Sequence, residues 1–129
     1  MGPSVPKVIL GQLGCSYGKS TILAVYANYL KELHKDAKVI VCTPTPWLKH
    51  QICTHFGLVR ELEYIDSSNG LFLIEQQELE SIPETALRKS ILIVDEVDQL
   101  LSKEELMPYA LKAQRLIGLS ATLGGKVGL

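Results

Sequence analysis

The sequence has no apolar stretch of the roughly 18 residues that a membrane-spanning helix needs, and its N-terminus lacks the apolar core of a secretory signal. Its three cysteines (Cys15, Cys42 and Cys53) are odd in number and show no paired spacing. This pattern argues against a disulfide framework and favours a reducing compartment. Together these absences predict a cytoplasmic, intracellular protein without a membrane span.

The chain also lacks an excess of charge of one sign, because it has 13 basic and 14 acidic residues. The composition therefore gives no sign of a dedicated nucleic-acid binder, whose domain is usually basic, although a local basic groove stays open. His50, Cys53 and His55 lie close together but lack a fourth ligand, so we expect no metal centre there.

What the chain does have is enough apolar sequence for a core. With 129 residues, 47% of them hydrophobic, residues 1–129 fit one globular domain. We expect flexible ends over residues 1–5 and 124–129, the latter rich in glycine.

Strand and helix signals alternate along the chain. Apolar, β-branched runs predict strands at 5–13 (with its loop), 38–43, 71–74 and 115–119, a short strand at 62–65, and a strand at 91–94 that is covered on both faces. A helix is expected from Lys19, and its buried face should consist of Ile22, Val25, Tyr26, Tyr29, Leu30 and Leu33. Further helices are expected from Pro46 to about Phe56 and after capping boxes at 81–84 and 102–105.

Such alternation with short connections predicts an α/β three-layer sandwich. Its centre would be a parallel sheet of about five strands with helices on both faces. Ligands of these sheets bind beyond the carboxyl ends of the strands.

A glycine-containing turn between the first strand and the first helix fits a phosphate-binding loop. In Gly14-Cys15-Ser16-Tyr17-Gly18-Lys19-Ser20-Thr21, backbone N–H groups would cradle the phosphates of ATP. Lys19 would reach the β- and γ-phosphates, and the Ser20 hydroxyl would help to hold Mg²⁺. The loop is irregular, since Leu13 occupies the place of the first glycine, so a strand-to-helix turn with a surface lysine is the alternative.

Two adjacent carboxylates follow the most apolar strand. After Ile91-Leu92-Ile93-Val94, Asp95 is placed to hold Mg²⁺ and Glu96 to orient or deprotonate the attacking water. The alternative is an acidic pair at a helix N-terminus. Lys19 and Glu96 are thus the candidate catalytic residues, and Ser20 and Asp95 the candidate metal ligands.

These segments resemble motifs of one known group. Gly18-Lys19-Ser20, Thr43-Pro44-Thr45-Pro46, Asp95-Glu96-Val97-Asp98 and Ser120-Ala121-Thr122 look like motifs I, Ia, II and III of superfamily-two helicases. Asp-Glu-Val-Asp followed by Gln99-Leu100-Leu101 looks especially like the first motor domain of SecA-type preprotein translocases.

The resemblance implies a RecA-like, P-loop ATPase domain that uses ATP and Mg²⁺. It also implies that Ser120 and Thr122 couple the nucleotide site to a second RecA-like domain, in cis or in trans. That domain is expected to be absent from residues 1–129. The substrate would be nucleic acid or polypeptide.

Two functions therefore remain open at the level of sequence. In the first, the chain is the ATP-binding motor domain of a helicase-like or SecA-like translocase and hydrolyses ATP only when a second domain completes it. In the second, it is a degenerate P-loop domain that serves as a protein-interaction module without appreciable ATPase activity.

Overall fold

The computed structural model describes residues 7–12, 19–43 and 62–120. These residues form a five-stranded sheet in which every neighbouring pair of strands is parallel, in the order β1-β5-β4-β2-β3. The strands are β1 (Lys7–Gln12), β2 (Lys38–Thr43), β3 (Gly70–Glu75), β4 (Ser90–Asp95) and β5 (Arg115–Ser120). The predicted parallel α/β fold is therefore confirmed.

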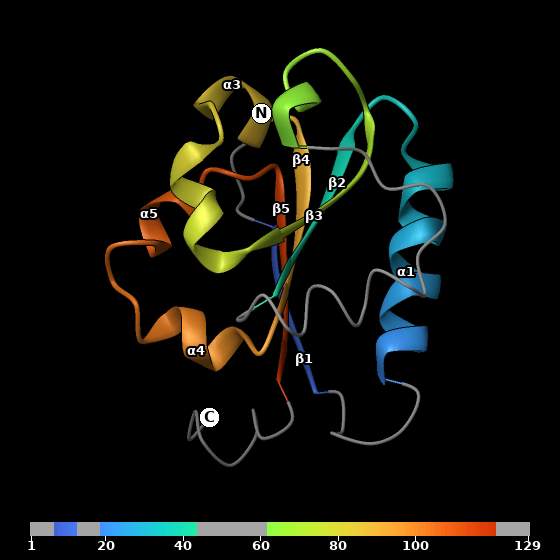
Figure 1. Cartoon of the computed structure of the whole chain (residues 1–129). Coiled ribbons are helices and arrows are strands. Elements are labelled where there is room, and N and C mark those ends of the chain that lie inside the picture. The colour runs from blue at the N-terminus through green and yellow to red at the C-terminus, as the bar shows by residue number, and fades with distance from the viewer. Residues whose placement is uncertain (1–6, 13–18, 44–61, 121–129) are drawn as a thin grey trace.

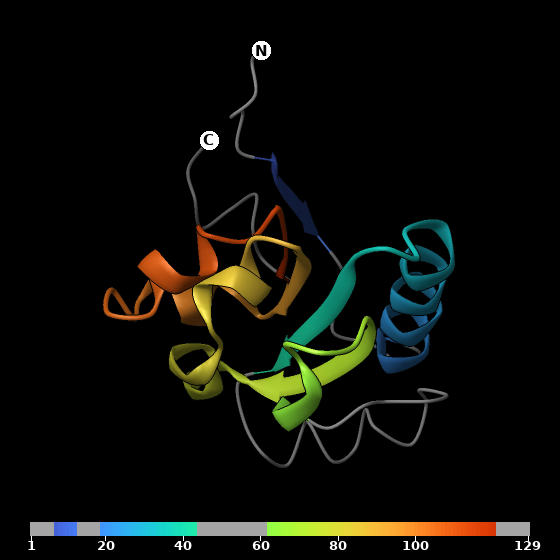
Figure 2. The same cartoon turned by 90° about the horizontal axis from the view of Figure 1, so that it is seen from above.

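Helices cover both faces of this sheet (Figures 1 and 2). The helix α1 lies on one face, and short helices lie on the other. Their bounds are α1 (Lys19–Leu33), α3 (Glu84–Leu87), α4 (Val97–Leu101) and α5 (Met107–Ala110), with 3₁₀ helices η1 (Leu62–Tyr64) and η2 (Gln76–Ser81). None of the helices in these described ranges is long and apolar enough to cross a membrane.

The strand β4 lies at the centre of the sheet, between β2 and β5. All six of its residues are buried, as the run Ile91-Leu92-Ile93-Val94 predicted. Its side chains alternate between two separate apolar clusters: Leu92 and Val94 belong to the cluster under α3, α4 and α5, whereas Ile91 and Ile93 belong to the cluster under α1. Burial on both faces holds this strand, and the residue that ends it, in a fixed place.

The buried face of α1 differs from the predicted one. Val25, Tyr29 and Leu33 are more than half exposed and Tyr26 is exposed as well, whereas only Leu30 of the described side chains expected inside is buried. The face that α1 packs against the sheet consists of Leu23, Ala24, Ala27 and Leu30. Their spacing of i, i+1, i+4 and i+7 also belongs to one helix face, and the two alanines allow the helix backbone to approach β2 and β3 closely.

Three local predictions are also wrong. Residues 62–65 form no strand; they pass through η1 into a turn in which the N–H groups of Ser67 and Ser68 both donate to the Tyr64 carbonyl. The helix after the first expected capping box exists as α3, but Pro83 rather than Ser81 precedes it. Ser102 begins no helix, because it ends α4 and its hydroxyl donates to the Gln99 carbonyl at 2.7 Å.

The expected helix from Pro46 to Phe56, the His50–His55 group and the chain ends lie outside the described residues.

Candidate functional site

The carboxyl ends of β1, β5 and β4 lie next to each other at one edge of the sheet, here called the carboxyl edge. Gln12 at the end of β1 is in register with Ser120 at the end of β5, and Leu119 is in register with Asp95 at the end of β4. Since neighbouring strands are about 4.8 Å apart, the ends of β1 and β4 are separated by roughly 10 Å. A ligand a few atoms long could therefore contact the ends of both strands.

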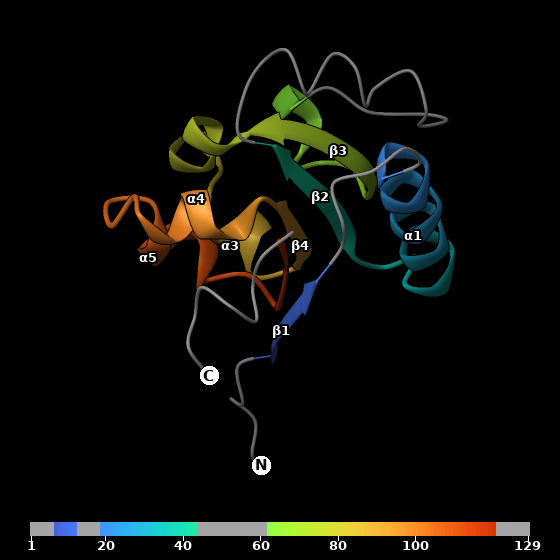
Figure 3. The same ribbon diagram turned by 90° about the horizontal axis from the view of Figure 1, so that it is seen from below.

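The helix α1 begins at the same edge (Figures 1 and 3). Lys19, Ser20 and Thr21 are its first three residues, so the structure places their backbone in its first turn. A helix of 15 residues presents unpaired N–H groups and the positive end of its dipole there, and this end attracts anions. The preceding Gly14, Cys15, Ser16, Tyr17 and Gly18 lie outside the described residues.

Asp95 is the charged residue that the fold buries at this edge. Its exposed fraction is 3%, although it directly follows the apolar core of β4. The thiol of Cys42 on neighbouring β2 is close enough for the Asp95 charge to affect its pKa. Burial raises the pKa of Cys42, Lys103 opposes this shift, and the negative charges of Glu78 and Asp95 add to it. The Asp95 carboxylate is therefore buried and lies near the Cys42 thiol of β2.

Glu96 has an unusual backbone conformation. Its φ of 57° and ψ of 56° are left-handed, and among the described residues it is the one non-glycine residue with positive φ. Such a conformation costs an L-amino acid about 1–2 kcal/mol. Glu96 joins β4 to α4, and its carbonyl accepts the N–H of Gln99 at 2.9 Å, so the chain turns sharply between the two elements. Strained residues that the surrounding structure holds in place are often found at functional sites.

Two further polar contacts at the carboxyl edge were not anticipated. Thr43 ends β2 fully buried, and its hydroxyl donates to the Ile74 carbonyl of β3 at 3.4 Å. Lys103, which follows α4, donates to the Oε1 of buried Gln76 at 2.9 Å and so links the segment after α4 to the start of η2. Contacts between segments so far apart in sequence leave no local signal.

The remaining predicted residues are only partly placed. Ser120 is the last residue of β5, between the ends of β1 and β4, whereas Thr122 lies outside the described residues. Within the described ranges, His, Cys, Asp and Glu side chains form no group of three or more suited to a metal ion.

Comparison with solved structures identifies the fold. The UvsW helicase from bacteriophage T4 superposes with a TM-score of 0.68 and 19% identity, over 92% of this chain and 48% of the helicase. The Sulfolobus solfataricus SWI2/SNF2 ATPase core, determined in complex with double-stranded DNA, gives a TM-score of 0.61 and 18% identity, over 92% of this chain and 29% of that core. The chain thus spans about half the length of the first and under a third of the second.

The sequence matches no protein-family profile, and no curated protein is significantly similar to it. At identities below 20% the structural likeness speaks for the fold alone, and neither superposed structure is a preprotein translocase. The architecture of this chain is therefore a RecA-like α/β fold, which it shares with these two structures.

Proposed function

We propose that this chain is the nucleotide-binding half of a helicase-like ATPase motor, with its MgATP site at the carboxyl edge. One observation carries the proposal: buried Asp95 and the strained Glu96 stand at the end of β4, on the edge where α1 begins. The RecA-like fold, which the chain shares with a helicase and an ATPase core, supports the same reading.

The residues fit ATP and Mg²⁺. Mg²⁺ prefers oxygen ligands and is usually held by one or two carboxylates together with substrate phosphates. Asp95 offers a carboxylate, and Ser20, which would offer the hydroxyl, is the second residue of α1. The Lys19 ammonium would neutralise the β- and γ-phosphates, aided by the positive end of α1. When bound, Mg²⁺ would neutralise the charge that develops on the transferred phosphoryl group.

Glu96 would act on water. As a partly exposed residue next to a buried one, it reaches solvent that Asp95 does not. The left-handed backbone of Glu96 turns the chain between β4 and α4, immediately after Asp95. We infer that Asp95 holds the cation and that Glu96 orients the attacking water or accepts its proton.

A partner domain is part of the proposal. Efficient phosphoryl transfer often uses an arginine finger, worth roughly 10³–10⁵ in rate. The two arginines in the described ranges, Arg88 and Arg115, precede β4 and begin β5, so they lie at the amino ends of the strands. A six-residue strand separates the two edges by roughly 17 Å, beyond the reach of either side chain. A second RecA-like domain, in cis or in trans, would supply the missing charge, and Ser120 and Thr122 would couple the two domains.

Calorimetry with MgATP and MgADP tests the site. We expect the chain to bind both nucleotides and Lys19→Ala to weaken this binding at least tenfold. Lys31→Ala, in the last turn of the same helix, is the matched control and should bind like the wild type. Absence of binding by the folded wild-type chain would favour the second candidate, an interaction module, to which the irregular Leu13 in the loop points.

The substrate that is moved is proposed to be a nucleic acid. Of the two superposed structures, one is a helicase and the other is an ATPase core bound to double-stranded DNA, which favours nucleic acid over a polypeptide. For the chain joined to its partner domain, duplex DNA should stimulate ATP hydrolysis and an unfolded polypeptide should not. Stimulation by the polypeptide alone would indicate the SecA-like function instead.

A further inference from the structure

A hydrogen bond between two side chains joins the segments that follow β3 and β4. The Lys103 ammonium donates to the Gln76 Oε1 at 2.9 Å, so a residue just after α4 is bound to the first residue of η2. Burial raises the pKa of the Cys42 thiol near the end of β2, and the charges of Lys103 and Asp95 act on it in opposite directions. Lys103 and Asp95 are therefore both near Cys42, at the carboxyl edge.

The backbone around Lys103 is held on both sides. Its N–H donates to the Leu100 carbonyl at 2.9 Å, and its own carbonyl accepts the N–H of Leu106 at 2.9 Å. Leu100 and Leu106 are buried in the apolar cluster that also contains Leu79 of η2. A side-chain bond from Lys103 therefore constrains the end of α4, a helix of only five residues.

Gln76 is a costly partner for this bond. Its side chain is 1% exposed, and its Nε2 finds no acceptor among the residues that the structure describes. An ammonium only donates, so the Oε1 must face Lys103 and the Nε2 must point elsewhere. A buried donor without an acceptor destabilises a fold, and leucine at this position would avoid that cost. The pair is thus better explained by the position that it gives α4 than by stability.

Lys103 has carboxylates close by as well. Its side chain is half-buried and borders a hollow of about 360 Å³ together with Glu80 and Glu105. None of the ion pairs within the described ranges includes Lys103, so its ammonium is bound to the amide rather than to a carboxylate. Solvent in the hollow can take the place of the ammonium, so we expect variants of Lys103 to fold.

The start of α4 lies directly after Glu96. The left-handed backbone of Glu96 is held in place against a steric cost. A helix of five residues is roughly 7.5 Å long, so a movement of its end displaces the residue before its start. The bond at Lys103 therefore helps to fix the turn at Glu96.

We propose that Lys103 is a positioning residue for the Glu96 carboxylate. By binding Gln76, Lys103 holds α4, and α4 holds the turn from which the Glu96 side chain extends. The role of this arrangement in the reaction rests on the proposed function, in which Glu96 acts on the attacking water. The positioning itself can be measured without a nucleotide, so the two can fail separately.

The first measurement follows backbone amide signals by NMR in the chain of 129 residues without nucleotide. In Lys103→Met the amide signal of Glu96 should shift. The Gln99 amide, which donates to the Glu96 carbonyl, should exchange its hydrogen about tenfold faster than in the wild type.

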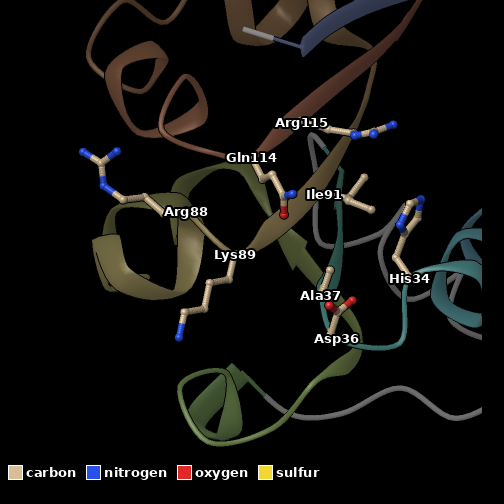
Figure 4. Close-up of a pocket in the computed structure, with 8 residues that line it drawn as sticks. All are labelled: His34, Asp36, Ala37, Arg88, Lys89, Ile91, Gln114 and Arg115. Atoms are coloured by element: carbon tan, nitrogen blue, oxygen red, sulfur yellow. The ribbon is translucent and has the colours of Figure 1, made fainter. Parts of the chain in front are cut away.

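Lys89→Met is the matched control, because it makes the same substitution at the opposite edge of the sheet. Lys89 borders a hollow at the amino ends of the strands, and Figure 4 shows its side chain extending away from Arg115 and from the Gln114 amide. The amides of Glu96 and Gln99 should behave in this variant as they do in the wild type.

The second measurement is ATP hydrolysis by the chain joined to its partner domain. Lys103→Met and Gln76→Leu should each lower kcat about tenfold and leave KM for ATP within about twofold, because a displaced catalytic group slows the reaction without weakening binding. The double variant should lose no more than either single variant, since both remove the same bond. Lys103→Arg keeps a donor and should retain most of the rate.

The proposal is overturned if the Glu96 and Gln99 amides respond alike to Lys103→Met and Lys89→Met. It is also overturned if Lys103→Arg is as slow as Lys103→Met, or if KM changes instead of kcat. If the wild-type chain with its partner domain hydrolyses no ATP, the proposed function fails, and the amide signals alone then decide whether Lys103 positions the turn.

Discussion

The left-handed backbone of Glu96 predicts that glycine and alanine will have opposite effects at two positions only three residues apart. At position 96, glycine adopts φ of 57° without penalty, whereas alanine keeps the steric clash of a Cβ atom. At position 99, inside α4 and exposed, the backbone is helical and alanine is favoured. Glu96→Gly and Glu96→Ala both remove the carboxylate, so the difference between them isolates the backbone contribution.

The expected magnitude follows from the conformation. The left-handed penalty of about 1–2 kcal/mol is partly offset, because glycine loses more conformational entropy on folding, by about 0.5–1 kcal/mol. Glu96→Gly should therefore exceed Glu96→Ala in unfolding free energy by about 0.5–1 kcal/mol. At Gln99 the order should reverse, with alanine more stable than glycine by about 1 kcal/mol.

Chemical denaturation at constant slope, with thermal unfolding as a second measurement, can resolve these differences. One kcal/mol corresponds to roughly 3–6 °C in Tm for a domain of this size. The reasoning is refuted if alanine equals or exceeds glycine at position 96 while position 99 behaves as a helix should. In that case the Glu96 backbone would not be under strain in solution.

Three other predictions concern the core, the reaction and an ion pair. Leu30→Ala should destabilise the chain by about 2–5 kcal/mol in a denaturation assay, because Leu30 is buried against the sheet. Leu33, on the same helix, is 57% exposed, so Leu33→Ala should cost well under half as much. Equal costs would contradict the face assigned to α1. In a phosphate-release assay the isolated chain should hydrolyse ATP only at a basal rate, and a partner domain should raise that rate strongly. Glu96→Gln should abolish the increase while MgATP binding persists. Fast hydrolysis that is unchanged by Glu96→Gln would rule out the proposed chemistry. The Arg88 and Lys112 side chains lower the pKa of Glu84 below its ordinary 4.5. The stabilisation from the Glu84 carboxylate is therefore present above pH 4.5 and disappears as the pH falls through the lowered pKa. The difference in unfolding free energy between wild type and Glu84→Gln should close in acid, and a difference that widens would refute the prediction.

The sequence predicted most strands of the sheet because they are short apolar runs, and β2 and β4 are buried along their whole length. The run at 91–94 is the clearest case, and it forms the central strand. Hydrophobic periodicity was less reliable for α1. Large apolar residues were assigned to the core, but the helix packs through Ala24 and Ala27, whose small side chains bring it close to β2 and β3. Periodicity finds a helix more readily than it finds which of two partly apolar faces is buried.

The candidate site was predictable only in part. The order of Lys19 and Asp95 along the chain, each after an apolar run, placed both at one edge of a parallel sheet. The left-handed turn at Glu96 was not predictable, since glycine or asparagine is the usual signal for positive φ.

The position of β5 in the sheet has a consequence for the order of folding. Within the described part of the chain, β1 is an edge strand whose one neighbour is β5, so Lys7 pairs with Arg115, more than 100 residues later. Such non-local pairing forms late and slowly, because a long loop must close before any contact compensates for its entropy. During synthesis, β2, β3 and β4 can associate while β1 still lacks a partner. The start of α1 would then reach its position at the carboxyl edge only after residue 120 has emerged from the ribosome.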